Sequence, residues 1–293
     1  MKLLSYGATG SQGRPVAEKL IAAGHEVRLL TREPEKVTGL EGAVVVRGDM
    51  ADASSLEAAT EDREGVFLHI PFFTPTPLDG LTYAHNALDA ARAAGVKLLV
   101  WNASGEIPSA RSGNPGFDVR LDILDAIKAS EIPYIVLQPT AYMENFLGPW
   151  TREELVASDT FAYPTPNTVM VQWIATQDVG TFATYAFDHP ELAPLDLKIS
   201  GPERLNGEGV AERFSQALGR TITFRAMPAE EFGRKLDAVF PGLGAGAAQG
   251  YAAAYEHPER FSSNVDLAAA LAKMPVEPTP LAMWLREHAA AFR

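Results

Sequence analysis

The chain has 293 residues, 46% of them apolar and 21% charged, which is the balance of a globular protein with a substantial core. Its net charge of −12 disfavours nucleic acid as a partner, because binding phosphate requires a basic surface. The absence of cysteine excludes disulfides, thiolate metal sites and cysteine nucleophiles.

Neither a membrane span nor a signal peptide is visible in the sequence. No stretch reaches the roughly 20 apolar residues that a membrane helix needs, and Gly7 and Thr9 interrupt the apolar start early. We therefore expect a cytoplasmic protein without a membrane partner.

The first half of the chain alternates short apolar runs with amphipathic segments. Helices are expected over residues 15–23, 52–60, 78–94 and 118–130. Strands are expected to begin at Lys2, Glu26, Ala43, Gly65, Val96 and Tyr134. This alternation predicts a doubly wound α/β fold, a parallel Rossmann sheet with helices on both faces.

After about Gly148 the alternation stops. Residues 175–187 and 208–219 resemble helices, and residues 196–201 and 221–228 resemble short strands. The Gly- and Ala-rich segment 240–261 is compatible with a loop, a loose helix or a lid, and Thr279 is expected to cap a last helix. We predict a nucleotide-binding domain over 1–148 and a smaller mixed α/β domain over 149–293, and we leave open that the chain crosses back to the sheet.

The segment GATGSQG lies between the first strand and the first helix. A tight glycine turn there brings backbone N–H groups and a helix N-terminus against a pyrophosphate. The alternative is that the glycines only make the turn, but the strand and helix on either side favour a dinucleotide site. The residues expected to contact the cofactor are Gly7, Thr9, Gly10, Ser11, Gln12 and Gly13.

The ends of the second and third strands indicate which dinucleotide is bound. Arg32 can grip a ribose 2′-phosphate, whereas Glu33 could instead hold a ribose hydroxyl, and the arginine favours NADP(H) over NAD(H). Asp49 is either an acceptor for the adenine edge, with Met50 packing on the ring, or a helix-capping aspartate. The sequence leaves these two roles of Asp49 open.

With these residues the sequence resembles the NmrA-like family of atypical short-chain dehydrogenases. The resemblance rests on GATGSQG, on LTR and GDMAD after the second and third strands, on IPFFT, and on the stretch leading to Glu144 and Asn145. It implies a Rossmann domain with a small C-terminal domain. Family members include NAD(P)H-dependent reductases of quinones and related small molecules, and NADP(H)-binding regulators that act through protein contact.

The resemblance also places loops around the cofactor. It implies cofactor contacts for Ile70, Pro71, Phe72, Ala103 and Ser104. It implies substrate contacts for Phe73, Tyr142, Asn145 and Phe146, with Trp150 beside them in an apolar cleft.

Catalytic residues are less clearly marked. None of the eight tyrosines is followed four residues later by lysine, so the usual Tyr/Lys dyad is absent. Some relatives carry a lysine early in the helix after strand five, where this chain has Val119 and Arg120, and arginine cannot act as an acid. Ser104 and Tyr142 remain the catalytic candidates, and His69 is interpreted as a packing residue.

Other chemistries have no support. The six histidines form no HExxH motif or other short pairing, so no metal is expected. We predict an NADP(H)-dependent reductase of a small apolar carbonyl or quinone. The alternative is a non-catalytic NADP(H) sensor that acts through a regulatory protein partner.

Overall fold

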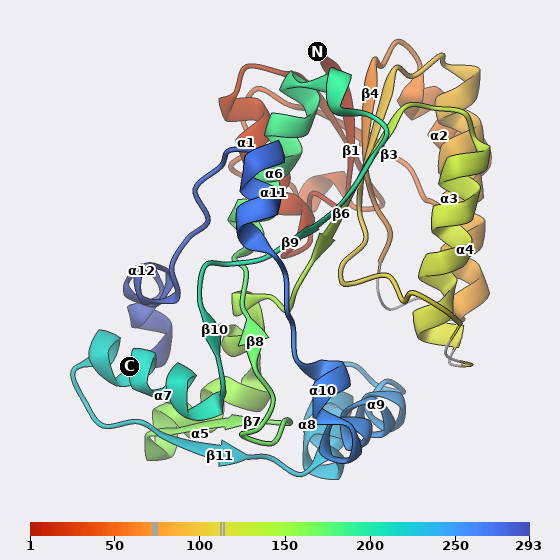
Figure 1. Cartoon of the computed structure of the whole chain (residues 1–293). Helices are drawn as coiled ribbons and strands as arrows, with labels where there is room; N and C mark the ends of the chain where they lie inside the picture. The colour runs from red at the N-terminus through yellow and green to blue at the C-terminus, as the bar shows by residue number, and fades with distance from the viewer. Residues whose placement is uncertain (72–75, 112, 114) are drawn as a thin grey trace. The chain divides into compact units, whose positions relative to one another are not determined.

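A computed structural model describes residues 1–71, 76–111, 113 and 115–293. The chain forms two compact units (Figure 1). The sheet unit contains residues 1–139, 176–199 and 268–276, and the second unit contains residues 140–175, 200–267 and 277–293. The chain thus returns twice to the sheet unit, a division that differs from a single boundary at 148/149.

The sheet unit is built on seven parallel strands in the order β3-β2-β1-β4-β5-β6-β9. The strands are β1 (Lys2–Tyr6), β2 (Glu26–Thr31), β3 (Val44–Arg47), β4 (Gly65–His69), β5 (Leu98–Asn102), β6 (Tyr134–Pro139) and β9 (Leu195–Ile199). The order runs outward in both directions from β1 and β4, which makes their carboxyl ends the switch point of the sheet. The predicted doubly wound Rossmann fold is therefore confirmed.

Two segments expected in the smaller C-terminal part belong to the sheet unit instead. β9 pairs in parallel with β6 as the last strand of the large sheet. Helix α6 (Thr176–Asp188) packs against α1 (Gly13–Ala22), and the main chain of α1 approaches α6 closely at Gly180, where a Cβ would lie 2.9 Å from the carbonyl oxygen of Pro15. Residues 175–187 and 196–201 lie beyond the expected boundary at 148/149, and the sequence left open a crossing back to the sheet, because short amphipathic elements do not reveal their distant partners.

Helices cover both faces of the sheet (Figure 1). On one face lie α2 (Ala53–Thr60), α3 (Pro77–Ala93) and α4 (Pro115–Ala129), and on the other lie α1, α6 and α11 (Leu267–Lys273). Short 3-10 turns follow β2 and α6, η1 (Pro34–Lys36) and η3 (Pro190–Leu192). The core beneath α2–α4 includes the fully buried Leu68, Ala87 and Ile127.

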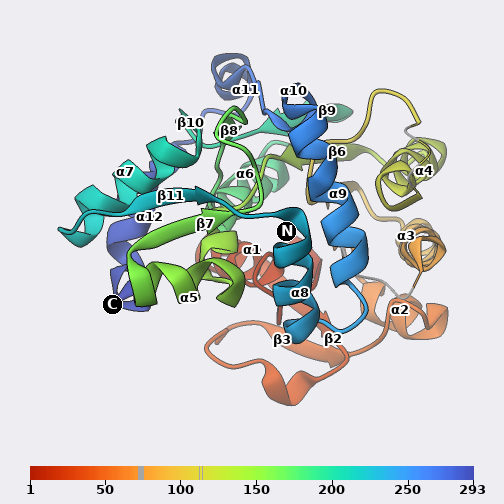
Figure 2. The same ribbon diagram turned by 90° about the horizontal axis from the view of Figure 1, so that it is seen from below.

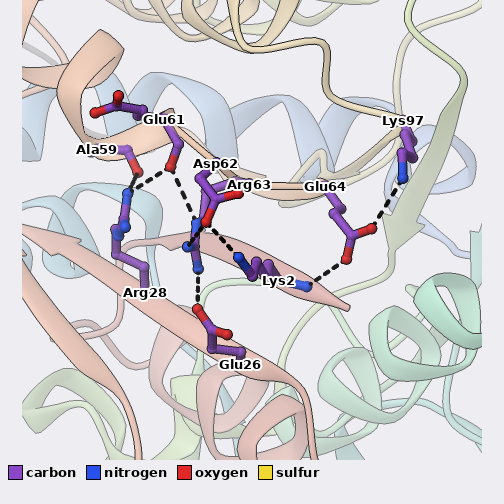
Figure 3. Close-up of polar contacts among 9 residues, drawn as sticks. All are labelled: Lys2, Glu26, Arg28, Ala59, Glu61, Asp62, Arg63, Glu64 and Lys97. Carbon is purple, nitrogen blue, oxygen red and sulfur yellow. Dashed lines mark hydrogen bonds and ion pairs between the residues drawn. The ribbon is translucent and has the colours of Figure 1, made fainter.

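An ion network joins the amino ends of the strands (Figure 3). Arg63, with a side chain only 4% exposed, pairs with Glu26 at 2.9 Å and with Asp62 at 3.4 Å. Lys2 also binds Asp62, and its backbone N–H donates to Glu64 at 3.0 Å. Because these charges satisfy one another at the edge opposite the glycine turn, we assign the network to the stability of the sheet.

The second unit holds two small sheets, antiparallel β10–β8 and parallel β11–β7. Its strands are β7 (Thr160–Tyr163), β8 (Val171–Gln172), β10 (Arg204–Leu205) and β11 (Thr223–Ala226). Its helices are η2 (Met143–Leu147), α5 (Pro149–Ser158), α7 (Gly207–Leu218), α8 (Ala229–Val239), α9 (Gly244–Glu256), α10 (Pro258–Phe261), α12 (Leu281–Glu287) and η4 (Ala289–Phe292).

The Gly- and Ala-rich segment is helical. α9 lies beside α8 (Figure 2), and a Cβ on Gly244 would be 2.3 Å from the carbonyl oxygen of Gly233. Small residues thus allow the two backbones to approach. The last helix begins at Leu281 with Pro280 at its N-cap, so the expected cap at Thr279 was wrong by one position. No helix in the described part of the chain is long and apolar enough to cross a membrane.

Candidate dinucleotide-binding site

The glycine turn connects β1 to α1 at the carboxyl edge of the sheet, and two of its glycines are required by the chain itself. Gly7 has a φ of +75°, and a Cβ there would lie 2.7 Å from Cδ2 of His69. A Cβ on Gly13 would lie 2.3 Å from the carbonyl oxygen of Gly7. Any side chain at either position would collide with neighbouring atoms, so both glycines serve the turn.

Gly10 is different, because the fold leaves room beside it. The nearest atom to a Cβ at Gly10 would be the carbonyl oxygen of Gly7 at 3.4 Å, an ordinary contact, and the residue is exposed. Gly10 also donates its N–H to that oxygen at 2.9 Å, which closes the turn. The open space beside Gly10 is where the backbone of a Rossmann turn meets a pyrophosphate.

Unpaired backbone donors gather at the same place. Within the described residues, the N–H groups of Ser11, Gln12 and Gly13 donate to no other group of the chain. Gln12 is the N-cap residue of α1, yet its side chain does not cap the helix. The free donors and the positive end of the helix dipole together favour an anion there.

Charged side chains surround the end of β2. Lys36 binds Glu33 at 2.6 Å, and this hydrogen bond lowers the pKa of Glu33. Arg47 pairs with Glu35 at 3.2 Å. Arg32 is exposed and makes no ion pair with the residues that the structure describes. The cation suited to a 2′-phosphate is therefore available, while the competing Glu33 is held by a lysine.

The structure tests one of the two roles left open for Asp49, that of the helix cap. Asp52, not Asp49, caps α2, accepting the N–H of Ser54 at 3.1 Å. Asp49 forms its own turn by accepting the N–H of Ala51 at 3.0 Å. The capping alternative for Asp49 was wrong, and its role at the adenine edge stays a prediction. Met50 beside it is buried, with 8% exposure.

Four polar side chains meet at the carboxyl ends of β4 and β5. Gln12 Oε1 accepts hydrogen bonds from Asn102 Nδ2 at 3.3 Å and from Ser104 Oγ at 3.0 Å. His69 Nδ1 lies 3.4 Å from Ser104 Oγ. Burial lowers the pKa of His69 to about 4, so the ring is neutral at pH 7. Ser104, a catalytic candidate, thus contacts a residue of the glycine turn.

The backbone on either side of this cluster is tightly held. Ser104 adopts a left-handed conformation, with a φ of +55°. Arg120, at the position where a lysine was considered, is buried and donates from Nε to the carbonyl oxygen of Ala103 at 3.0 Å. Its guanidinium therefore stabilises the loop after β5. Ile70 is buried and Pro71 exposed, whereas Phe72 and Phe73 lie outside the described residues.

The remaining predicted residues belong to the second unit. Tyr142 is 7% exposed, and its backbone forms a bridge with Ile174. Asn145 is half-buried in η2. Phe146 is completely buried, with its ring centroid 4.5 Å from that of Trp173. We therefore assign Phe146 to the core of this unit rather than to a substrate surface.

Two further side chains of this unit are fixed by neighbours within it. Trp150 is half-buried, and its ring lies edge-on to Phe232 at 6.1 Å. Glu144 accepts a hydrogen bond from Trp284 Nε1 at 3.1 Å. Among the described residues, no group of three or more His, Asp or Glu side chains is placed to hold a metal ion.

Sequence reasoning missed the contact between Gln12, Asn102 and Ser104. Asn102 ends β5, and β5 is separated from β1 by β4 alone. Because carboxyl ends of neighbouring parallel strands share one edge, that position was the available signal. The exact hydrogen bonds depend on side-chain orientations that no spacing reveals.

Fold and turn together define a doubly wound α/β protein of the Rossmann type. The sequence model of the NmrA-like family matches residues 1–284, and the chain belongs to this family. It is 27% identical over 294 residues to a (4-alkanoyl-5-oxo-2,5-dihydrofuran-3-yl)methyl phosphate reductase of Streptomyces griseus subsp. griseus, covering 99% of both chains.

Two solved structures share the fold. The triphenylmethane reductase of Citrobacter sp., complexed with NADP(H), superposes with a TM-score of 0.81 at 21% identity, over 98% of this chain and 99% of that chain. NmrA, a negative transcriptional regulator in complex with NADP, superposes with a TM-score of 0.73 at 17% identity, over 98% and 94% of the chains. A reductase and a regulator therefore share this fold.

Proposed function

We propose that this protein is an NADP(H)-dependent reductase of a small apolar carbonyl or quinone. The observation that carries the proposal is the open space at Gly10 beside three unpaired N–H groups at the start of α1. Family membership and the 27% identical reductase of S. griseus support it. When bound, the cofactor would supply the hydride, and the protein would supply binding and orientation.

The residues present fit such a cofactor. The N–H groups of Ser11, Gln12 and Gly13 would bind the pyrophosphate, and Asp49 with Met50 would flank the adenine. The loops after β4 and β5 would follow the cofactor at the edge of the sheet; they comprise Ile70, Pro71, Phe72, Ala103 and Ser104. On the substrate side we keep Phe73, Tyr142 and Asn145.

A preference for NADP(H) over NAD(H) is part of the proposal. Arg32 is exposed and forms no ion pair among the described residues, so its guanidinium is available to bind a 2′-phosphate in a bidentate manner. Glu33, the residue that would favour NAD(H), is paired with Lys36 at 2.6 Å. Both observations favour the same cofactor.

Hydride addition to a carbonyl leaves an oxygen that needs a proton. Ser104 carries a hydroxyl at the carboxyl edge of the sheet, where it donates to Gln12 at 3.0 Å and lies 3.4 Å from the neutral His69. Arg120 is buried and holds backbone, so it cannot replace the missing lysine. We propose Ser104 as the proton donor and Tyr142 as the second candidate.

The test is a turnover screen of the purified protein. NADPH consumption is followed against a panel of quinones and aldehydes, with NADH in parallel. We expect turnover of at least one compound with NADPH and a clear preference over NADH. Tight NADPH binding with no turnover across the panel would contradict the reductase proposal.

One observation favours a second candidate, a non-catalytic NADP(H) sensor acting through a protein partner. The lysine position is occupied by Arg120, whose guanidinium is committed to the backbone of Ala103. NmrA, with the same fold, is a regulator. Binding without turnover, together with a change in a partner's affinity on addition of NADPH, would favour the sensor.

A further inference from the structure

Asn102 lies at the end of β5 and is only 1% exposed, so its side chain is almost completely shielded from solvent. We propose that Asn102 is a positioning residue that fixes the orientation of the Gln12 amide, so that the NH2 group of Gln12 faces the cofactor. The inference rests on the proposed function, because the group to be bound is an acceptor oxygen of the dinucleotide. Neither residue would take part in the hydride transfer.

The orientation follows from one backbone group. The N–H of Ser104 can only donate, and it donates to Asn102 Oδ1 at 2.9 Å. This contact identifies the oxygen of the Asn102 amide and leaves Nδ2 as a donor. Nδ2 lies 3.3 Å from the Gln12 amide, so the Gln12 atom facing it must be the oxygen. The hydroxyl of Ser104, at 3.0 Å, donates to the same oxygen.

Gln12 consequently presents its nitrogen elsewhere. Nε2 carries two N–H donors, and within the described residues it makes no hydrogen bond. The residue is half-buried and is the N-cap of α1, next to the unpaired N–H groups of Ser11 and Gly13. The amide therefore adds two donors to a site that already favours negative charge. A flipped amide would present its oxygen there and repel a phosphate oxygen.

The backbone conformation of Ser104 supports the proposed orientation of the two amides. Ser104 has a φ of +55°, a conformation that non-glycine residues rarely adopt. In this conformation its N–H reaches Asn102 and its hydroxyl reaches Gln12. The loop after β5 is further held by Arg120, which donates to Ala103. The strained residue thus supplies both contacts that orient the two amides.

The variant Asn102→Asp tests this orientation. The aspartate retains an acceptor for the N–H of Ser104 but replaces the donor to Gln12 with a second acceptor, so the Gln12 amide should turn over. We expect the Kd for NADPH to rise at least about tenfold, since a charge-assisted donor is lost. In a Gln12→Ala background, the same Asn102→Asp change should have a much smaller effect.

This double-mutant cycle separates orientation from charge. Direct repulsion between the new carboxylate and the cofactor acts in both backgrounds and cancels in the cycle. Equal effects of Asn102→Asp in the two backgrounds would overturn the inference. Urea unfolding of each variant shows whether it has folded before its Kd is compared.

A second measurement needs no cofactor. Side-chain amide NMR of the free protein should show slow hydrogen exchange at Asn102 Nδ2 and fast exchange at Gln12 Nε2. The opposite order of exchange would overturn the inference even if NADPH binds. If the wild-type protein binds no NADPH, the proposed function fails, and the exchange order then decides the amide orientation separately.

Discussion

Replacing Gly10 with alanine tests whether the glycine turn holds a dinucleotide. The new methyl would meet only the carbonyl oxygen of Gly7, at 3.4 Å, and the φ of Gly10 is not positive. The fold should therefore tolerate it, with stability unchanged or raised by up to about 1 kcal/mol. The methyl enters the space that we propose for the pyrophosphate, where losing roughly two charge-assisted hydrogen bonds would cost about 3 kcal/mol. The Kd for NADPH should rise about 100-fold.

Two other glycines provide matched controls. A Cβ in Gly13→Ala would lie 2.3 Å from the carbonyl oxygen of Gly7, so this variant should lose about 3 kcal/mol or more of unfolding free energy. Gly246, in α9, has no atom within 4 Å of a Cβ, so Gly246→Ala should gain about 1 kcal/mol and bind NADPH normally. Urea unfolding and fluorescence titration with NADPH measure both quantities. A folded Gly10→Ala protein with wild-type NADPH affinity would refute the reasoning.

Three further outcomes follow from other contacts. Arg32→Ala should weaken NADPH binding about tenfold or more and leave NADH within twofold, whereas Lys97→Ala, at the amino edge of the sheet, should alter neither; equal losses for both cofactors would exclude a 2′-phosphate contact. Because burial depresses the pKa of His69 from 6.5 to about 4, the folded state keeps it neutral, and stability should fall by about 3 kcal/mol as pH drops from 6.5 to 4. In urea unfolding of His69→Gln, the unfolding free energy should change much less between pH 6.5 and 4. An unchanged pH dependence would contradict the lowered pKa of His69. Arg63→Met should cost about 1–2 kcal/mol, because it removes a buried guanidinium that pairs with two exposed carboxylates, whereas Arg92→Met in an exposed pair should cost under about 0.5 kcal/mol. Equal losses of unfolding free energy in the two arginine variants would contradict the argument that the buried ion pairs contribute more than the exposed pair.

The sheet was largely predictable because its signals are local. Apolar runs of four to six residues, such as those at Lys2 and Gly65, became β1 and β4 within one or two residues of the expected bounds. Nearly continuous apolar strands can only be buried on both faces, and this requires helices on each side. Gly24 and Gly95, just after α1 and α3, adopt positive φ values of +85° and +68°, the conformation that glycine commonly takes past a helix C-terminus.

The pairing of β9 could not be predicted from the local sequence. Its residues alternate between buried and exposed side chains, a pattern that suits an edge strand in any sheet. Its partner β6 lies some 60 residues earlier in the chain, and only the packing of the whole sheet selects it. The same limit applies to α6, whose partner α1 is still more distant.

The candidate site divides in the same way. Two aspartates precede α2, and which one caps it depends on where the helix begins, so Asp52 rather than Asp49 takes that role. Phe146 follows a strand end near the expected substrate side, but an apolar ring suits a core as well as a cleft. Its contacts with four other aromatic side chains and with Trp173 were decided by the second unit as a whole.

The sequence by itself determined the parallel sheet, the position of the glycine turn and the presence of Arg32 at the end of β2, because each depends on residues close together in the chain. Only the tertiary structure decided that Gly10 is the open one of the turn's three glycines, that Glu33 is paired with Lys36, and that Gln12 Oε1 accepts a hydrogen bond from Asn102. The physical reason is that open space, ion pairing and amide orientation are properties of neighbours in space. Hydrogen-bond directions propagate from one fixed backbone N–H through side chains about 90 residues apart, and no spacing along the chain encodes them.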